Sequence, residues 1–126
     1  MGYFRKLCKA TNGEYILGKE EKSMIQYANE ENYQSLVSEG VVLVDFYGEN
    51  CQPCKMLARV LEELDDELPF INIVKVNTDE CPNLSKEFKI YGIPDVYFYK
   101  DGKVISHGSG LVDIDEIKEK LSQLLY

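Results

Sequence analysis

Two cysteines separated by two residues, Cys51 and Cys54, are the part of this chain best suited to chemistry. They follow an apolar, β-branched run at 41–47, which predicts a buried strand, and precede an amphipathic segment at 55–64, which predicts a helix. The motif therefore stands at a helix N-terminus, whose partial positive charge stabilises a thiolate. Because the second thiol can attack a mixed disulfide formed by the first, the motif predicts thiol–disulfide exchange.

The same cysteine spacing also begins many zinc sites, so a metal has to be considered. A structural zinc ion needs four ligands, and Cys8, Cys81 and His107 form no second close pair. We therefore predict no metal site, while a zinc-binding structural domain and a purely structural disulfide stay open as alternatives. Cys8 receives no role, Cys81 is expected to be an inert free thiol, and His107 is expected to face outward from a strand.

The segment that contains these cysteines resembles the active-site segment of thioredoxins, and three further segments match that family in the same order. The four segments are 44–56, 73–79, 91–94 and 100–103. The resemblance covers nearly the whole chain from residue 24 onward. It implies an α/β protein with the thioredoxin fold, a central mixed β-sheet flanked by helices. It also implies a protein-disulfide reductase whose only redox group is the dithiol itself, with no separate cofactor.

Position and resemblance together give roles to the residues around the motif. Cys51 lies at the open end of the helix and is expected to be the exposed attacking thiolate, whereas Cys54 is expected to be the buried resolving thiol. The resemblance makes Asp45, an acid within an apolar strand, the general base for Cys54, with Lys75 as its tuning partner. From the residues alone, Asp45 could equally face solvent at a strand end and Lys75 could extend out of the sheet.

Two loops are expected to form the surface that binds the target protein: Asn50, Gln52 and Pro53 in one, and Ile93, Pro94 and Asp95 in the other. The resemblance implies a cis peptide bond before Pro94 and a backbone that pairs with an extended target segment. Asp95 stands where thioredoxins usually have threonine, and it would either disfavour acidic targets or be solvated. Asn50 and Tyr47 replace two family tryptophans, so we expect a different or narrower set of targets.

Composition and charge define the class of protein. The 126 residues suit one domain, and a net charge of −8 argues against general nucleic-acid binding. No stretch has the ~20 apolar residues that span a bilayer. Residues 1–23 carry a net charge of +2 and the remainder −10. We therefore expect an N-terminal extension at 1–23, either a short hairpin near 11–17 or disordered, followed by a thioredoxin domain at 24–126.

Residues 1–23 lack the apolar core of a secretory signal, so we expect a cytoplasmic protein, where structural disulfides are rare. The expected partners are target proteins that carry disulfides and a thioredoxin reductase that supplies electrons, and we expect a monomer. The rival from another functional class is a binding module with the same fold that holds a partner without turnover.

The remaining elements follow from hydrophobic pattern and turn residues. Strands are predicted at 24–27, 70–77, 96–100 and 104–107, and helices at 29–38, 53–68, 84–88 and 113–125. The last helix is expected to begin at Asp113, and a turn at Asp101-Gly102 should join the final two strands. Aromatic residues, among them Phe46, Phe70, Phe88 and Phe98, are expected to pack in the core.

Overall fold

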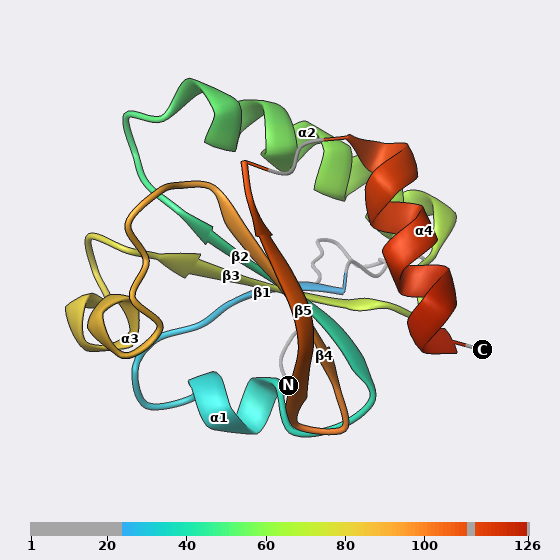
Figure 1. The fold of residues 1–126 in the computed structure, drawn as a ribbon, viewed down its shortest axis with the longest axis horizontal. Helices are drawn as coiled ribbons and strands as arrows, with labels where there is room; N and C mark the ends of the chain where they lie inside the picture. The colour runs from blue at the N-terminus through green and yellow to red at the C-terminus, as the bar shows by residue number, and fades with distance from the viewer. Residues whose placement is uncertain (1–23, 111–112, 126) are drawn as a thin grey trace, which may run out of the picture.

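A computed structural model describes residues 24–110 and 113–125, and in this part of the chain a five-stranded sheet lies between two layers of helices (Figure 1). The strands are β1 (Ile25–Tyr27), β2 (Val41–Tyr47), β3 (Asn72–Asn77), β4 (Asp95–Lys100) and β5 (Lys103–Ser109). The helices are α1 (Tyr33–Leu36), α2 (Gln52–Glu67), α3 (Pro82–Glu87) and α4 (Ile114–Leu125). Cys8 and the hairpin predicted near 11–17 lie outside the described residues.

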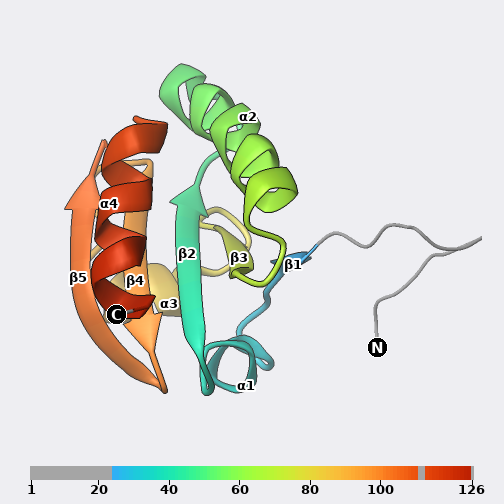
Figure 2. The same cartoon turned by 90° about the vertical axis from the view of Figure 1, so that its right-hand side faces the viewer.

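The strand order is β1-β3-β2-β4-β5, with β1, β3 and β2 parallel and with β4 antiparallel to both β2 and β5. The predicted mixed sheet flanked by helices is therefore confirmed. β2 lies at its centre and is covered on both faces, which explains why its sequence is a nearly continuous apolar run. In Figure 2, α4 lies in front of the sheet and α3 behind it.

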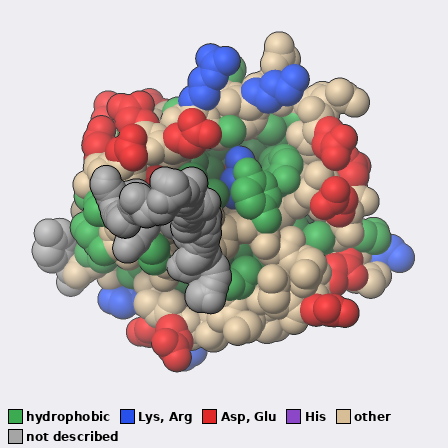
Figure 3. All heavy atoms as spheres, turned by 180° about the vertical axis from the view of Figure 1, so that it is seen from behind, with side chains coloured by type: hydrophobic (Ala, Val, Ile, Leu, Met, Phe, Trp, Pro, Cys, Tyr) green, Lys and Arg blue, Asp and Glu red, His purple; other side chains and the backbone are tan. Residues whose placement is uncertain are grey.

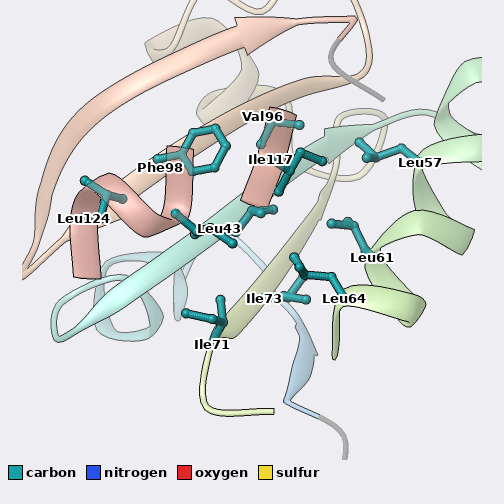
Figure 4. Packing of buried hydrophobic residues seen from close by; sticks show 11 residues of the cluster. Leu43, Leu57, Leu61, Leu64, Ile71, Ile73, Val96, Phe98, Ile117 and Leu124 are labelled. Atoms are coloured by element: carbon teal, nitrogen blue, oxygen red, sulfur yellow. The ribbon is translucent and has the colours of Figure 1, made fainter. Parts of the chain in front are cut away.

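Side-chain alternation along β2 divides the core into two clusters. Leu43 joins the cluster beneath α2 and α4, which also contains Ile73, Phe98 and Leu57 (Figure 4). The neighbouring positions of β2 point to the opposite face. They join a cluster with α1 and α3 that includes Val42, Val44, Phe46, Tyr33 and Tyr97. Asp45 shares the parity of Leu43, so it lies on the face that α2 covers.

A turn residue pair and a helix cap lie at the positions predicted from the sequence. Asp101 and Gly102 both have positive φ values, 51° and 86°, and they form the two-residue turn between β4 and β5. The carboxylate of Asp113 accepts a hydrogen bond from the backbone N–H of Asp115 at 2.8 Å, which caps the start of α4. Both predictions are confirmed.

Two local predictions were wrong. The helix predicted at 29–38 starts only at Tyr33, because the carboxamide of Asn29 accepts hydrogen bonds from the backbone N–H groups of Glu31 and Asn32 and so forms a turn. Phe70 precedes the start of β3 and is 61% exposed, so it is not a core residue.

On the face of the molecule seen from behind, acidic side chains gather at several places along the margin, with hydrophobic side chains between them (Figure 3).

Candidate active site

The two cysteines lie where β2 leads into α2. Cys51 occupies the N-cap position in an extended conformation, and its sulfur accepts a hydrogen bond from the backbone N–H of Cys54 at 3.2 Å. Pro53 lies in the first turn, where its missing N–H leaves no hydrogen bond unmade. Cys51 and Cys54 are joined by a disulfide with their Cα atoms 5.2 Å apart. When this bond is reduced, the same N–H and the helix dipole stabilise a thiolate on Cys51.

The prediction that Cys51 is exposed is wrong for the disulfide form. Cys51 is 9% exposed and Cys54 is 4% exposed, so the difference has the expected sign but is small. The sulfur of Cys51 lies 3.8 Å from the carbonyl oxygen of Ile93 in the second loop. Access to this sulfur therefore depends on how the two loops are arranged around it.

The second loop approaches the motif closely. The peptide bond between Ile93 and Pro94 is cis, as the resemblance predicted. A Cβ atom added at Gly48 would lie 2.6 Å from Cδ1 of Ile93, so glycine allows the two loops to meet. The carbonyl oxygen of Pro94 accepts a hydrogen bond from the backbone N–H of Gly110 at 2.7 Å, which ties the loop to the end of β5.

The six residues predicted to bind targets differ in exposure. Asn50, Gln52 and Pro53 are exposed beside the disulfide, and Ile93 is half-buried. The remaining two, Pro94 and Asp95, are buried, so their side chains offer little surface to a partner. The accessible part of the predicted surface is thus the first loop together with Ile93.

Asp95 is not solvated, which corrects one of the two alternatives proposed for it. It is 6% exposed, and its Oδ1 lies 3.4 Å from Nδ1 of His107 on β5. The ring of His107 stacks on Tyr97, with 4.6 Å between centroids and 11° between planes. His107 itself is exposed, as predicted. The acid therefore contacts a histidine at the sheet edge instead of facing open solvent.

Asp45 and Lys75 are directly opposite each other in adjacent strands, β2 and β3. Asp45 is fully buried, so the alternative in which it faces solvent is wrong. The ammonium nitrogen of Lys75 lies 4.0 Å from Oδ2 of Asp45, and neither carboxylate oxygen accepts a hydrogen bond from any described residue. Burial raises the pKa of Asp45 from 3.8 to about 7, and the charge of Lys75 opposes this rise. A carboxyl group with this pKa can gain and lose a proton near neutral pH.

Two tyrosines next to Lys75 were missed in the sequence. The ammonium nitrogen of Lys75 lies 5.7 Å from the ring centroid of Tyr27 and 5.0 Å from that of Tyr47. The sequence indicates the position of Tyr47, since this residue follows Asp45 by two and therefore lies on the same face of β2. The position of Tyr27 depends on the pairing of β1 with β3, which no local pattern encodes.

Cys81 is a free thiol that is 2% exposed, and burial raises its pKa, so its thiolate is disfavoured, in agreement with the predicted inert role. Within residues 24–110 and 113–125, no group of three or more His, Cys, Asp or Glu side chains could hold a metal ion. Among the helices of the same residues, none is long and apolar enough to cross a membrane.

Known proteins are similar to this chain over most of its length. The family model described as Thioredoxin matches residues 24–123. A thioredoxin from Chlamydia trachomatis is 39% identical over 100 residues, which cover 79% of this chain and 98% of that protein. A thioredoxin from Bacillus subtilis is 36% identical over 99 residues, or 78% of this chain and 95% of that protein. The chloroplastic M-type thioredoxin of Pisum sativum is 36% identical over 117 residues, which cover 90% of this chain and 68% of that protein.

Proposed function

Because the chain belongs to the thioredoxin family and is a protein-disulfide reductase, we propose that Cys51 is its nucleophile, Cys54 its resolving thiol and Asp45 its general base. The observation that carries this assignment is the disulfide at the N-terminus of α2, with the Cys51 sulfur accepting the N–H of Cys54. The first cysteine is the one whose thiolate the helix end stabilises. The second is 4% exposed, and its sulfur is bonded to that of the first.

The reaction runs in two exchanges. The thiolate of Cys51 attacks one sulfur of a target disulfide, a mixed disulfide forms, and the other target sulfur leaves and takes up a proton. Cys54 then loses its proton to the carboxylate of Asp45 and attacks the Cys51 sulfur. The mixed disulfide breaks, the second target sulfur is protonated, and the Cys51–Cys54 disulfide forms. The target gains two electrons and the dithiol loses them.

The partners follow from this balance of electrons. Targets are proteins with accessible disulfides, and a thioredoxin reductase returns two electrons to the Cys51–Cys54 disulfide after each turnover. This cycle requires a reducing compartment, which favours the cytoplasm, and it works in a monomer. The functional unit is residues 24–126, with 1–23 as an extension. The target surface comprises Asn50, Gln52 and Pro53 with Ile93, Pro94 and Asp95, the last two contributing mainly backbone.

The role of Lys75 is to hold the pKa of Asp45 within reach of neutral pH. Without a cation, burial alone would raise that pKa further, and the carboxyl group would stay protonated when Cys54 must lose its proton. The distance of 4.0 Å supports this tuning role, because it is close enough for charge attraction.

Cysteine replacements test the assignment of the two thiols. Cys51→Ser should abolish reduction of a protein disulfide, whereas Cys54→Ser should make the first attack and accumulate a stable mixed disulfide. Cys81→Ser is the matched control, because this buried free thiol takes no part, and it should turn over at the rate of the parent protein. Normal turnover by Cys51→Ser would refute the assignment. Capture of partners without a disulfide link would instead favour the non-catalytic binding module.

A further inference from the structure

A row of side chains crosses three strands of the sheet and ends at Asp45, the proposed general base. Tyr27 of β1 is the register partner of Lys75 on β3, and Lys75 is the register partner of Asp45 on β2. Tyr47, two residues beyond Asp45, lies diagonally across from Lys75 on the same face. The Lys75 ammonium group therefore has Asp45 and two aromatic rings as neighbours.

The geometry is suited to cation–π attraction. The distances of 5.7 Å and 5.0 Å from the Lys75 nitrogen to the ring centroids of Tyr27 and Tyr47 lie within the range of about 6 Å where this attraction acts. Lys75 needs such neighbours, because its flexible four-carbon stem would otherwise allow the ammonium group to move into water. The side chain retains 11% exposure, so water is close enough to compete.

We propose that Tyr27 and Tyr47 are positioning residues of the reductase, whose rings hold the ammonium group of Lys75 against Asp45. The inference rests on the proposed function, since it gives these rings a part in the step where Asp45 acts as base. Neither tyrosine needs to touch the target or the cysteines for this effect. The rings act on the resolution step through the position of one cation.

The pKa of Asp45 depends on the position of Lys75. Among the described residues, Lys75 is the cation that lowers the pKa of Asp45. Tyr47 lies nearby on its own strand, and burial raises the pKa of that hydroxyl, so it stays neutral. Val96, the register partner on β4, is apolar, and Cys54 of the covering helix α2 is held in the disulfide. If the ammonium group moves away, no other described cation replaces it, and the pKa of Asp45 rises.

Leucine and phenylalanine replacements separate the ring from the hydroxyl. Tyr27 is 65% exposed, so Tyr27→Leu should fold normally and remove one ring, whereas Tyr27→Phe keeps it. Tyr47→Leu and Tyr47→Phe repeat the test at the second ring. Phe70→Leu is the control, because it replaces an exposed aromatic residue outside the row. The first measurement is the carboxyl carbon chemical shift of Asp45 against pH in the disulfide form. The second is the pH profile of the resolution rate in the reduced protein.

We expect Tyr27→Leu to raise the pKa of Asp45 by about 0.5 unit, equivalent to ~0.7 kcal/mol at 1.36 kcal/mol per unit. With less carboxylate present, resolution at pH 6 should slow by about threefold and should be unchanged at pH 9. The rate of first attack by Cys51 should not change. Tyr27→Phe and Phe70→Leu should behave as the parent protein in both measurements.

Two results would overturn the proposal: an unchanged Asp45 titration in both leucine variants, or equal shifts in the leucine and phenylalanine variants. The proposed function fails on a different result, namely an Asp45→Asn variant that resolves mixed disulfides at the parental rate at every pH. In that case the chemical-shift titration of Asp45 still tests the position of Lys75, because it needs no turnover.

Discussion

Replacing the buried acid Asp45 with asparagine should stabilise the folded protein, and the gain should increase with pH. The carboxylate is fully buried, has one cation 4.0 Å away and accepts no hydrogen bond from the described residues. Burial therefore raises its pKa from 3.8 to about 7. Since the unfolded chain ionises this group more readily than the folded chain does, ionisation favours unfolding.

The sign and size follow from the two pKa values. Below pH 3.8 the group is protonated in both states and has no effect on stability. As the pH rises from 3.8 to about 7 only the unfolded state gains the charge, and above 7 the full difference of about 3 units applies. At 1.36 kcal/mol per unit, the cost of Asp45 is about 2 kcal/mol at pH 5.5 and about 4 kcal/mol at pH 8.5. The advantage of Asp45→Asn should therefore grow by about 2 kcal/mol between these values.

Urea unfolding of the disulfide form at pH 5.5, 7 and 8.5 measures this advantage, and all three values lie above the pI of about 4.7. Asp66→Asn, which removes a charge from an exposed position of α2, is the matched control and should change stability by less than ~0.5 kcal/mol at each pH. The slope of free energy against urea should stay constant. An advantage of Asp45→Asn that does not vary with pH would refute the reasoning, because it would show that ionisation of Asp45 is not what costs stability.

Two further predictions concern the loop contact and the N-terminal segment. Gly48→Ala should push the Ile93 side chain away from the first loop, raising the KM for a protein disulfide by roughly threefold to tenfold with kcat nearly unchanged; steady-state kinetics showing a loss in kcat alone would contradict this. Deletion of residues 1–23 should leave the free energy of unfolding and the reductase activity nearly intact, because the family match begins at residue 24. Non-cooperative unfolding of the shortened chain would assign that segment a structural role.

The order of the elements could be predicted because local signals agreed with the fold. The apolar run of β2 and the helical pattern of α2 are long and strongly periodic, so their type was clear from the sequence. The wrong local predictions arose where a side chain formed a hydrogen bond with the nearby backbone, or where an apolar residue was exposed. Asn29 bonds to its own turn in place of capping a longer helix, and Phe70 follows Pro69 in a turn outside the sheet.

The residues of the dithiol site could be identified from the sequence, but their environments could not. The exposure of Cys51 depends on the carbonyl group of Ile93, which is 42 positions further along the chain. Asp95 and His107 meet through the pairing of β4 with β5, and the two tyrosines reach Lys75 through the pairing of three strands. The turn at Asp101-Gly102 sets the register of β4 and β5, but the irregularity between Phe98 and Tyr99 shifts it at Asp95 and His107. The parallel pairing of β1, β3 and β2 joins distant segments, so these neighbours are not visible in any local pattern.

The cost in stability at Asp45 and its proposed use as a base have the same physical origin. A carboxylate that accepts several hydrogen bonds has a low pKa, would be ionised at all physiological pH values, and would bind a proton from Cys54 only weakly. A carboxyl group with no cation nearby would stay protonated at neutral pH and could accept nothing. A single ammonium group at 4.0 Å, without a hydrogen bond from the described residues, leaves Asp45 between these limits, with a pKa of about 7. The rings that hold that ammonium group therefore act on both properties through one pKa: a variant that raises it should slow proton transfer below pH 7 and lower stability above pH 7.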